Sequence, residues 1–468
     1  MGRRLADDLT ALLESESDDP VLPRVRGAEL HELFDEPPPR AGCAPEVWLD
    51  ACRQLIIPHN RRNGHPRFFA YVCSSADPIG VLADALASAM NQNVTSWRSA
   101  PAATEIERLV IRWLDELLGF DGDGHGMFVS GGSSANAAGI ACALMNANRA
   151  GQSPPREAMT VYVSPEGHLS LVKAARLLGV RDEHIRRPSI DDARRMMPDA
   201  LERMIAEDRD AGRVPVCVCA SAGTTNTGAI DPLEQIADVC GRCGVWLHID
   251  GAYGAPAAMT DDYAWLKRGF ARADSLSIDP HKWLFAPIDA GCVLFRDAGA
   301  TRRAFNVESE YTRTTRTEPV ERFAFFDHGS EMSRRFRALK VWAILKVRGT
   351  DAIARIIQRN IDLRRQLDAR INAEPRLESL GGDLSITCFR YRPAHVADDA
   401  ALNAFNQRVL ETLVAEGRLL MSPTTLDGRF ALRACIVNFR TTAQDVDFLL
   451  DEVLRVGTVL HHAPRTGA

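Results

Sequence analysis

The sequence predicts an α/β protein with a mainly parallel sheet in a large domain, followed by a smaller C-terminal α+β domain. Between about residues 61 and 297, short apolar runs alternate with stretches of helical periodicity. Such alternation is typical of parallel strands joined by helices. Polar residues and glycines follow directly after most of these runs. Because ligands of such sheets bind at the carboxyl ends of the strands, we expect the functional site there.

The first sixty residues predict a helical arm. An amphipathic helix comes first, a proline joint follows at Pro37–Pro39, and a second helix is expected around Pro45–Ile57. An arm of this length is too small to bury a core of its own.

The large domain is expected over residues 61–348. Its predicted strands lie in six segments, each followed by polar residues: 126–132, 160–168, 216–230, 245–253, 275–283 and 291–297. Residues of about 298–333 are rich in Arg, Thr and Glu without clear periodicity, and a connection of this length is a candidate mobile loop. Helical periodicity resumes over Ser333–Arg348.

The C-terminal domain is expected over residues 349–468. It begins with a long helix, has strands at 385–391 and 430–437, and closes with a helix from Ala443.

Composition excludes several classes of function. The chain has 468 residues, with 56 Lys+Arg against 62 Asp+Glu, and this net charge of −6 favours neither nucleic acid nor a membrane surface as a partner. The first twenty residues lack the apolar core of a secretory signal, and no later segment approaches a membrane span, so we expect a cytoplasmic protein. The 11 cysteines are scattered, and Cys240 and Cys243 lack a second Cys or His pair, so no metal is expected.

Lys282 is the first candidate catalytic residue. Only five of the basic residues are lysines, and this one follows a predicted strand between His281 and Trp283. A desolvated amine can form a Schiff base with a carbonyl, which arginine cannot do. A lysine that extends to the solvent is the alternative when the residue is considered alone.

Two further features favour a functional lysine. Asp250 ends the apolar run WLHID, where an isolated carboxylate is costly unless it meets a cation such as a pyridinium nitrogen. Ser133 and Ser134 follow a Gly-Gly turn at the start of an Ala-rich helix, and free N–H groups and hydroxyls at a helix start bind phosphate. An imine-forming lysine, an acid for a ring nitrogen and a phosphate seat together describe a site for pyridoxal 5′-phosphate.

The chain resembles the group II pyridoxal-phosphate-dependent amino-acid decarboxylases, the family of aromatic-L-amino-acid decarboxylase and its histidine and glutamate relatives. The resemblance runs from about His65 to the C-terminus and rests on seven motifs besides the serine loop: HPRFFAYV (65–72), SWRSAPAATEIERLVIRWL (96–114), SPEGHLSLVKAA (164–175), GTTNTGAID (223–231), HIDGAYG (248–254), DPHKWL (279–284) and RRFRALKVW (334–342). It implies a fold-type I, aspartate-aminotransferase-like protein with a seven-stranded sheet. It also implies a homodimer with shared active sites, in which the N-terminal arm takes part.

The resemblance assigns roles to individual residues. It implies that Lys282 forms the Schiff base with the cofactor, that Asp250 pairs with the ring nitrogen, and that Ser133 and Ser134 bind the phosphate. It also implies that His168 stacks on the ring, that Thr225 lies beside the substrate carboxylate, and that Ala252 is the small residue beneath the ring. It implies that His281 contacts the phosphate or a transferred proton. Asp279 stands where many relatives have Asn, and its role stays open.

Tyr311 lies in the candidate mobile loop, 29 residues after Lys282. The resemblance implies that this tyrosine, reaching across from the partner subunit, protonates the substrate carbon after CO₂ has left. Relatives with Phe there release aldehydes, so Tyr311 favours a decarboxylase that makes an amine.

The substrate pocket is predicted from the same resemblance. Its candidate residues are Tyr71, Val72, Asn93, Thr95 and Trp283. Several of these are smaller or more polar than in aromatic decarboxylases, which leaves fewer apolar faces for a planar substrate. Arg67 and Arg98 could meet an acidic side chain, although surface or interface arginines are the simpler interpretation.

We therefore expect a decarboxylase that converts an L-amino acid, first an aromatic one, to its amine and CO₂. A smaller or acidic substrate is an alternative, and so is an aldehyde synthase. An aminotransferase, with Arg433 as carboxylate ligand, fits the DPHKWL motif less well. A scaffold without activity has no support, because Lys282, Asp250, His168 and Tyr311 are all present.

Overall fold

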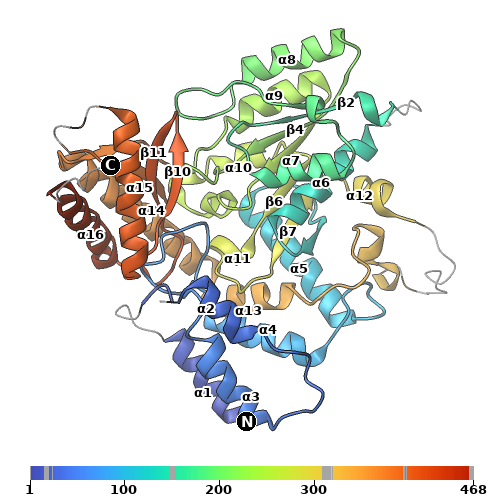
Figure 1. The fold of residues 1–468 in the computed structure, drawn as a ribbon. Helices are drawn as coiled ribbons and strands as arrows, with labels where there is room; N and C mark the ends of the chain where they lie inside the picture. Colours follow the sequence, from blue (N-terminus) through green and yellow to red (C-terminus); the bar gives the residue numbers. More distant parts are fainter. Residues whose placement is uncertain are drawn as a thin grey trace. The chain divides into compact units, whose positions relative to one another are not determined.

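The computed structural model describes residues 2–14, 20–23, 25–147, 154–307, 318, 320–393, 396 and 398–462 (Figure 1). The chain forms two compact units. The larger comprises Ala76–Ile361 and Gly382–Leu384, and the smaller comprises Met1–Ser75, Asp362–Gly381 and Ser385–Ala468. Among the described residues, no helix combines the length and apolar character needed to cross a lipid bilayer.

A seven-stranded sheet forms the centre of the larger unit. Its strands are β1 (Gly126–Val129), β2 (Met159–Val163), β3 (Ile185–Arg186), β4 (Val214–Ser221), β5 (Trp246–Asp250), β6 (Ser275–Ile278) and β7 (Gly291–Phe295). They lie in the order β1-β7-β6-β5-β4-β2-β3. Only β7 runs antiparallel to its neighbours, β1 and β6. The predicted α/β fold is thereby confirmed, and the two-residue strand β3 is the one that the apolar pattern did not indicate.

Helices surround this sheet in the larger unit (Figure 1). They are α4 (Pro78–Met90), α5 (Pro101–Leu118), α6 (Gly132–Asn146), α7 (Leu169–Leu177), α8 (Pro198–Asp210), α9 (Leu233–Cys243), α10 (Leu266–Phe270), α11 (Pro280–Trp283), α12 (Ala298–Phe305), α13 (Ala338–Arg348) and the first half of α14 (Thr350–Ala373). The predicted helix at 333–348 thus begins later, at Ala338.

Helix α6 lies unusually close to the sheet. A Cβ atom on Gly139 would lie 2.4 Å from Nδ1 of His248 on β5, so only glycine fits at this contact. Alanines at 135 and 138 are buried on the same helix. This small-residue composition lets the N-terminus of α6 reach the edge of the sheet where β4, β5 and β6 end.

The smaller unit has a four-stranded antiparallel sheet in the order β10-β11-β9-β8. Its strands are β8 (Leu377–Ser379), β9 (Ile386–Tyr391), β10 (Ser422–Leu426) and β11 (Arg429–Cys435), and its helices are α1 (Gly2–Leu13), α2 (Gly27–Phe34), α3 (Pro45–Ala51) with a π-helical turn at Cys52–Ile56, α15 (Asp399–Glu416), α16 (Ala443–His462) and the second half of α14. The strands β8 and β10 had not been expected, since they are short or partly exposed.

The smaller unit joins segments that the sequence analysis had assigned to three regions. Backbone hydrogen bonds explain this arrangement: Phe69 N donates to Leu420 O at 2.8 Å, and Cys435 N donates to Phe69 O at 2.9 Å. Phe69 is fully buried in the same apolar cluster as the C-terminal strands and helices. The chain before Ser75 therefore completes the core of the C-terminal sheet.

A buried ion pair holds together three separate parts of the larger unit. Arg334 binds Glu107 of α5 and donates to the carbonyls of Val94 at 2.7 Å and Phe128 at 2.8 Å. Glu107 in turn accepts from Phe128 N at 2.9 Å. Burial raises the pKa of Glu107, and the Arg334 guanidinium opposes that shift. These contacts fix β1, α5 and the segment before α13 relative to one another.

We predict that Arg334→Met lowers the free energy of unfolding by about 3–5 kcal/mol, because it leaves the Glu107 charge buried without its partner. Urea denaturation measures the loss. The matched control is Arg335→Met, whose side chain is 52% exposed and should cost less than about 1 kcal/mol. The double variant Glu107→Leu/Arg334→Met should recover part of the loss. Equal stability of the two single variants would contradict this account.

Candidate active site

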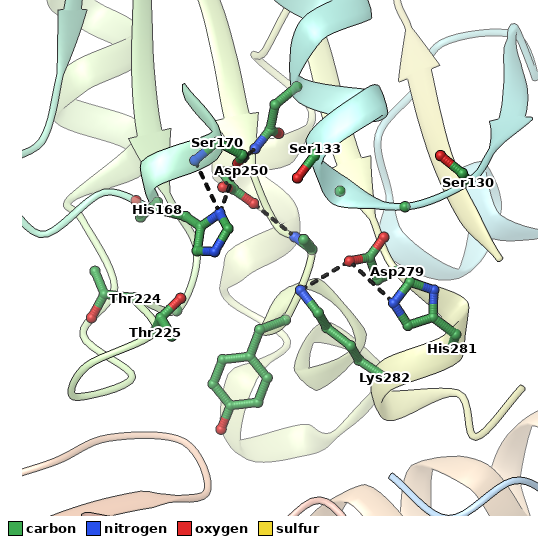
Figure 2. Close-up of a pocket in the computed structure, with 17 residues that line it drawn as sticks. Ser130, Ser133, His168, Ser170, Thr224, Thr225, Asp250, Asp279, His281 and Lys282 are labelled. Carbon is green, nitrogen blue, oxygen red and sulfur yellow. Dashed lines mark hydrogen bonds and ion pairs between the residues drawn. The ribbon is translucent and has the colours of Figure 1, made fainter. Parts of the chain in front are cut away.

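A cavity of about 320 Å³ opens at the carboxyl ends of the central strands of the larger unit (Figure 2). Its wall comes from the start of α6, the turn before α7, the loop after β4, and the turns after β5 and β6. The ends of parallel strands meet here, as expected for the ligand site of such a sheet.

The start of α6 forms one wall of the cavity. The N-cap residue Gly131 has extended backbone and no side-chain cap, so the first N–H groups of the helix stay available for a ligand. A Cβ atom on Gly132 would lie 2.9 Å from both Ala252 Cβ and Asp279 Oδ2, so only glycine leaves room at this point. Ser133 lines the cavity beside these groups. Free N–H groups, a hydroxyl and the helix dipole fit a phosphate.

Ser134 lies differently from its neighbour. Its Oγ is 2.8 Å from Oγ of Ser130, and it is not part of the cavity wall, whereas Ser130 is. Of the two serines predicted to bind phosphate, the structure thus brings only Ser133 to the cavity.

Lys282 extends from the one-turn helix α11 into the cavity (Figure 2). Its side chain is 23% exposed, and its Nζ lies 2.9 Å from Asp279 Oδ2. Asp279 is buried, and its Oδ1 has no hydrogen-bond partner among the described residues. A buried polar atom without a partner at a cavity wall is typical of a site that receives a further ligand.

His281 lies on the side of Asp279 away from Lys282. Its Nδ1 is 2.8 Å from the carbonyl of Ala290, and its Nε2 is 3.6 Å from Asp279 Oδ2. Burial lowers the pKa of His281, and the Asp279 carboxylate opposes this shift.

Asp250 ends β5 at the base of the cavity and is 7% exposed. Its Oδ2 accepts from Asn136 Nδ2 at 2.9 Å, and its Oδ1 accepts from Ala252 N at 3.1 Å and from Ser277 Oγ at 3.4 Å. A carboxylate accepts about four hydrogen bonds, so these three leave capacity for a donor from the cavity. The protonated nitrogen of a pyridine ring fits that requirement.

His168 caps α7 and lines the opposite wall (Figure 2). Its Nδ1 lies 2.7 Å from Ser170 Oγ. Burial lowers the pKa of His168, while the charge of Asp250 opposes the shift. A neutral imidazole at this wall can stack on an aromatic ring.

The cavity brings together seven of the predicted site residues, from five separate segments: Ser133, His168, Thr225, Asp250, Ala252, His281 and Lys282. Trp283 is fully buried and stacks on Tyr253 with ring centroids 5.1 Å apart, so it supports the wall without lining it. Tyr71 and Val72 belong to the smaller unit. Tyr311 lies outside the described residues.

Asn93 and Thr95 contact the segment that precedes α13. The Oδ1 of Asn93 accepts from Arg334 N at 2.8 Å, and Thr95 O accepts from Phe326 N at 3.3 Å. Neither residue lines the described cavity. Their predicted contact with the substrate therefore stays a prediction.

Several polar residues of the site were not predicted from the sequence: Ser130, Asn136, Ser170, Ser221, Thr224 and Tyr253. Asn136 had a usable signal, since it is a strongly polar side chain among small and apolar residues on the first turns of the helix after the serines. Ser170 lies two residues after the predicted histidine, but its partner on α6 is 34 residues away in the chain. The pairing could therefore not be read from local spacing. No group of three or more potential metal ligands occurs among the described residues.

Comparisons with known proteins agree with this geometry. Residues 29–392 match the family model of the pyridoxal-dependent decarboxylase conserved domain. The chain is 37% identical over 428 residues to an aromatic-L-amino-acid decarboxylase from Bacillus atrophaeus, covering 91% of this chain and 88% of that protein. It is also 27% identical over 480 residues to a phenylacetaldehyde synthase from Petunia hybrida, covering 99% and 94%.

Solved structures show the same relationship. The crystal structure of Oryza sativa TDC with PLP and tryptamine superimposes with a TM-score of 0.92 at 27% identity, covering 98% of this chain and 97% of that one. The structure of mouse CSAD has a TM-score of 0.89 at 27% identity, covering 97% and 98%. The chain therefore belongs to the pyridoxal-dependent decarboxylase family and uses pyridoxal phosphate as its cofactor.

Proposed function

We propose that this protein decarboxylates an aromatic L-amino acid to the corresponding amine and CO₂. The observation that carries the proposal is the single cavity that joins Lys282, Asp250, His168 and the open start of α6. The aromatic-L-amino-acid decarboxylase named above and a tryptophan decarboxylase from Camptotheca acuminata, at 30% identity, support an aromatic substrate over a smaller or acidic one.

The residues present fit pyridoxal phosphate, and each would hold a different part of it. The N–H groups of α6 and Ser133 would bind the phosphate, and Asp250 would pair with the ring nitrogen. His168 and Ala252 would flank the ring. When bound, the cofactor supplies a sink for the electron pair that the departing carboxylate leaves on the substrate carbon.

Lys282 would provide the amine that binds the cofactor aldehyde. An amine must lose a proton before it can attack a carbonyl. Asp279 Oδ2, at 2.9 Å from Nζ, is a base within reach of that proton. We therefore assign Asp279, whose role the sequence left open, to the transfer of a proton from Lys282.

The second candidate function is an aldehyde synthase, because phenylacetaldehyde synthases from Petunia hybrida and Arabidopsis thaliana are among the relatives. Both functions share the cofactor residues and differ in whether the substrate carbon is protonated. Tyr311, as a proton donor to that carbon, supports amine formation.

We further propose a cytoplasmic homodimer, with α4 in its interface. Leu82, Leu86 and Met90 are four residues apart on one face of α4, and Leu82 and Leu86 are 63% and 55% exposed. The adjacent face, at Gly80, Ala83 and Ala87, is buried within the unit. An exposed apolar row on a rigid helix fits a second copy of the chain.

The first prediction from this function concerns activity. The purified, cofactor-loaded protein should release CO₂ and an equal amount of amine from one aromatic L-amino acid in a panel of the common amino acids. Lys282→Ala should lose both the activity and the visible absorbance of bound cofactor. Lys346→Ala, on the exposed side of α13, should keep both. Release from glutamate or aspartate alone would contradict the aromatic assignment.

A second prediction concerns the product. Tyr311→Phe should bind the cofactor as the parent does but shift the product from amine toward aldehyde and ammonia, with consumption of oxygen, because the substrate carbon loses its proton donor. Mass spectrometry and an oxygen electrode measure the shift. Unchanged amine yield would show that another group delivers the proton.

A third prediction concerns the phosphate seat. Gly132→Ala places a methyl group 2.9 Å from Ala252 and Asp279, and overpacking of this kind costs about 1–3 kcal/mol. Affinity for pyridoxal phosphate, measured by equilibrium dialysis, should fall roughly tenfold or more. Gly241→Ala on α9 meets no atom within 4 Å and is the control. Equal affinities would place the phosphate elsewhere.

A fourth prediction concerns the dimer. Leu86→Asp should convert the protein from dimer to monomer in sedimentation equilibrium, because it puts a charge into an apolar interface. Leu177→Asp changes an equally apolar side chain that is 83% exposed on α7, and it should leave the dimer intact. A dimer that persists in Leu86→Asp would exclude α4 from the interface.

A further inference from the structure

A continuous chain of buried hydrogen bonds connects β5 and β6 to His168 within the larger unit. It starts at Trp246 Nε1, which donates to Ser275 Oγ at 2.9 Å, and Ser275 Oγ lies 2.8 Å from His248 Nδ1. His248 Nε2 is 3.0 Å from Asn136 Oδ1. The chain then branches at Asn136 toward Asp250 and Ser170, and Ser170 reaches His168. All of its members before His168 are buried.

The orientation of the Asn136 amide follows from Asp250. A carboxylate only accepts, so the amide nitrogen must face Asp250 Oδ2, as it does at 2.9 Å. The same nitrogen donates its second hydrogen to Ser170 Oγ at 3.0 Å. The amide oxygen therefore faces His248 Nε2, which must carry a hydrogen.

The donors and acceptors beyond His248 follow from the position of its hydrogen. Burial lowers its pKa to about 4, so the ring is neutral at pH 7 and has one hydrogen, on Nε2. Its Nδ1 accepts from the hydroxyl of Ser275. That hydroxyl oxygen in turn accepts from the indole of Trp246, which can only donate.

Ser170 sets the other end of the chain. Its hydroxyl oxygen already accepts from Asn136, and its backbone N–H points at His168 Nδ1 at 3.3 Å. A hydrogen on Nδ1 would face this N–H, donor against donor. His168 Nδ1 must therefore accept from Ser170, and the hydrogen of the neutral ring lies on Nε2, on the side of the ring away from Ser170 (Figure 2).

We propose that Asn136 and Ser170 are positioning residues that fix His168 as a neutral imidazole with its hydrogen on Nε2. His168 then presents an N–H donor and a ring without charge at the cavity wall. A neutral ring can stack on a cationic pyridine without repulsion, and the same Asn136 amide orients the carboxylate that favours that cation. This role of His168 toward the cofactor rests on the proposed function, whereas the tautomer does not.

Some of the charged groups around His168 raise its pKa and others lower it. Asp250 at the end of β5 and Asp279 before α11 favour a charged imidazole, while Lys282 on α11 and Lys173 on α7 oppose it, and burial opposes it most. These charges alone do not select one ring nitrogen. The hydrogen bonds of Ser170 and Asn136 make that selection.

The test uses protein without cofactor, labelled with ¹⁵N-histidine, because the two nitrogen shifts of an imidazole report which one carries hydrogen. His168→Gln identifies the signals of His168. At pH 7, His168 should show hydrogen on Nε2 and a bare Nδ1. Ser170→Ala and Asn136→Ala should each shift the ratio of the two tautomers roughly tenfold toward Nδ1–H, as expected for the loss of one hydrogen bond. Ser170→Thr should restore the parent ratio.

Asn146→Ala is the matched control, since Asn146 is another buried asparagine on α6 that bonds to Cys142 O and Ala300 O instead. It should leave the His168 signals unchanged. Hydrogen on Nδ1 in the parent protein would overturn the proposal, and so would a parent-like ratio in both alanine variants. Failure of decarboxylation with the predicted tautomer present would affect only the proposed function. If an alanine variant does not fold, the parent spectrum and Ser170→Thr still decide.

Discussion

The close packing of α6 on the central sheet is the constraint on which the site depends. Gly139 against His248 and Gly132 against Ala252 leave no space for a side chain. This approach brings two different features of one helix to the ends of the strands: its uncapped N-terminus and, one turn later, the Asn136 amide. The glycines in this helix thus allow the close approach at a cost in helix stability, since glycine is unfavourable within helices.

The two carboxylates of the cavity have different contacts. Asp279 lies beside Lys282 and His281 near the start of α6, whereas Asp250 is held by Asn136, Ala252 N and Ser277 at the base. The two carboxylates would therefore face different ends of an elongated ligand. One end of the site fits an anion and contains the amine of Lys282, and the other end fits a protonated ring nitrogen. This polarity defines a single direction for pyridoxal phosphate.

The sequence was sufficient for the fold and for the residues with distinctive chemistry. Strands predicted from apolar runs, and motifs such as DPHKWL, led to Lys282, Asp250 and His168, because each lies at the end of a strand or in the turn that follows it. It was insufficient where a role depends on distant contacts. Asn136 and Asp250 are 114 residues apart, and no local sequence pattern indicates their hydrogen bond. For the same reason Ser133 and Ser134 looked equivalent, although a bond to Ser130 draws Ser134 away. Tyr311 lies outside the described residues, so its role rests on the sequence alone.

The contact between Lys282 and Asp279 has a consequence for the protein before it is loaded. An ion pair favours the ammonium form, which does not attack carbonyl carbons. Pyridoxal phosphate would bring a dianion that the start of α6 can bind, and a ligand held in this way would stay beside the pair long enough for the proton to leave Lys282. The pair would thus make the reactivity of this lysine depend on prior binding of the anion at α6.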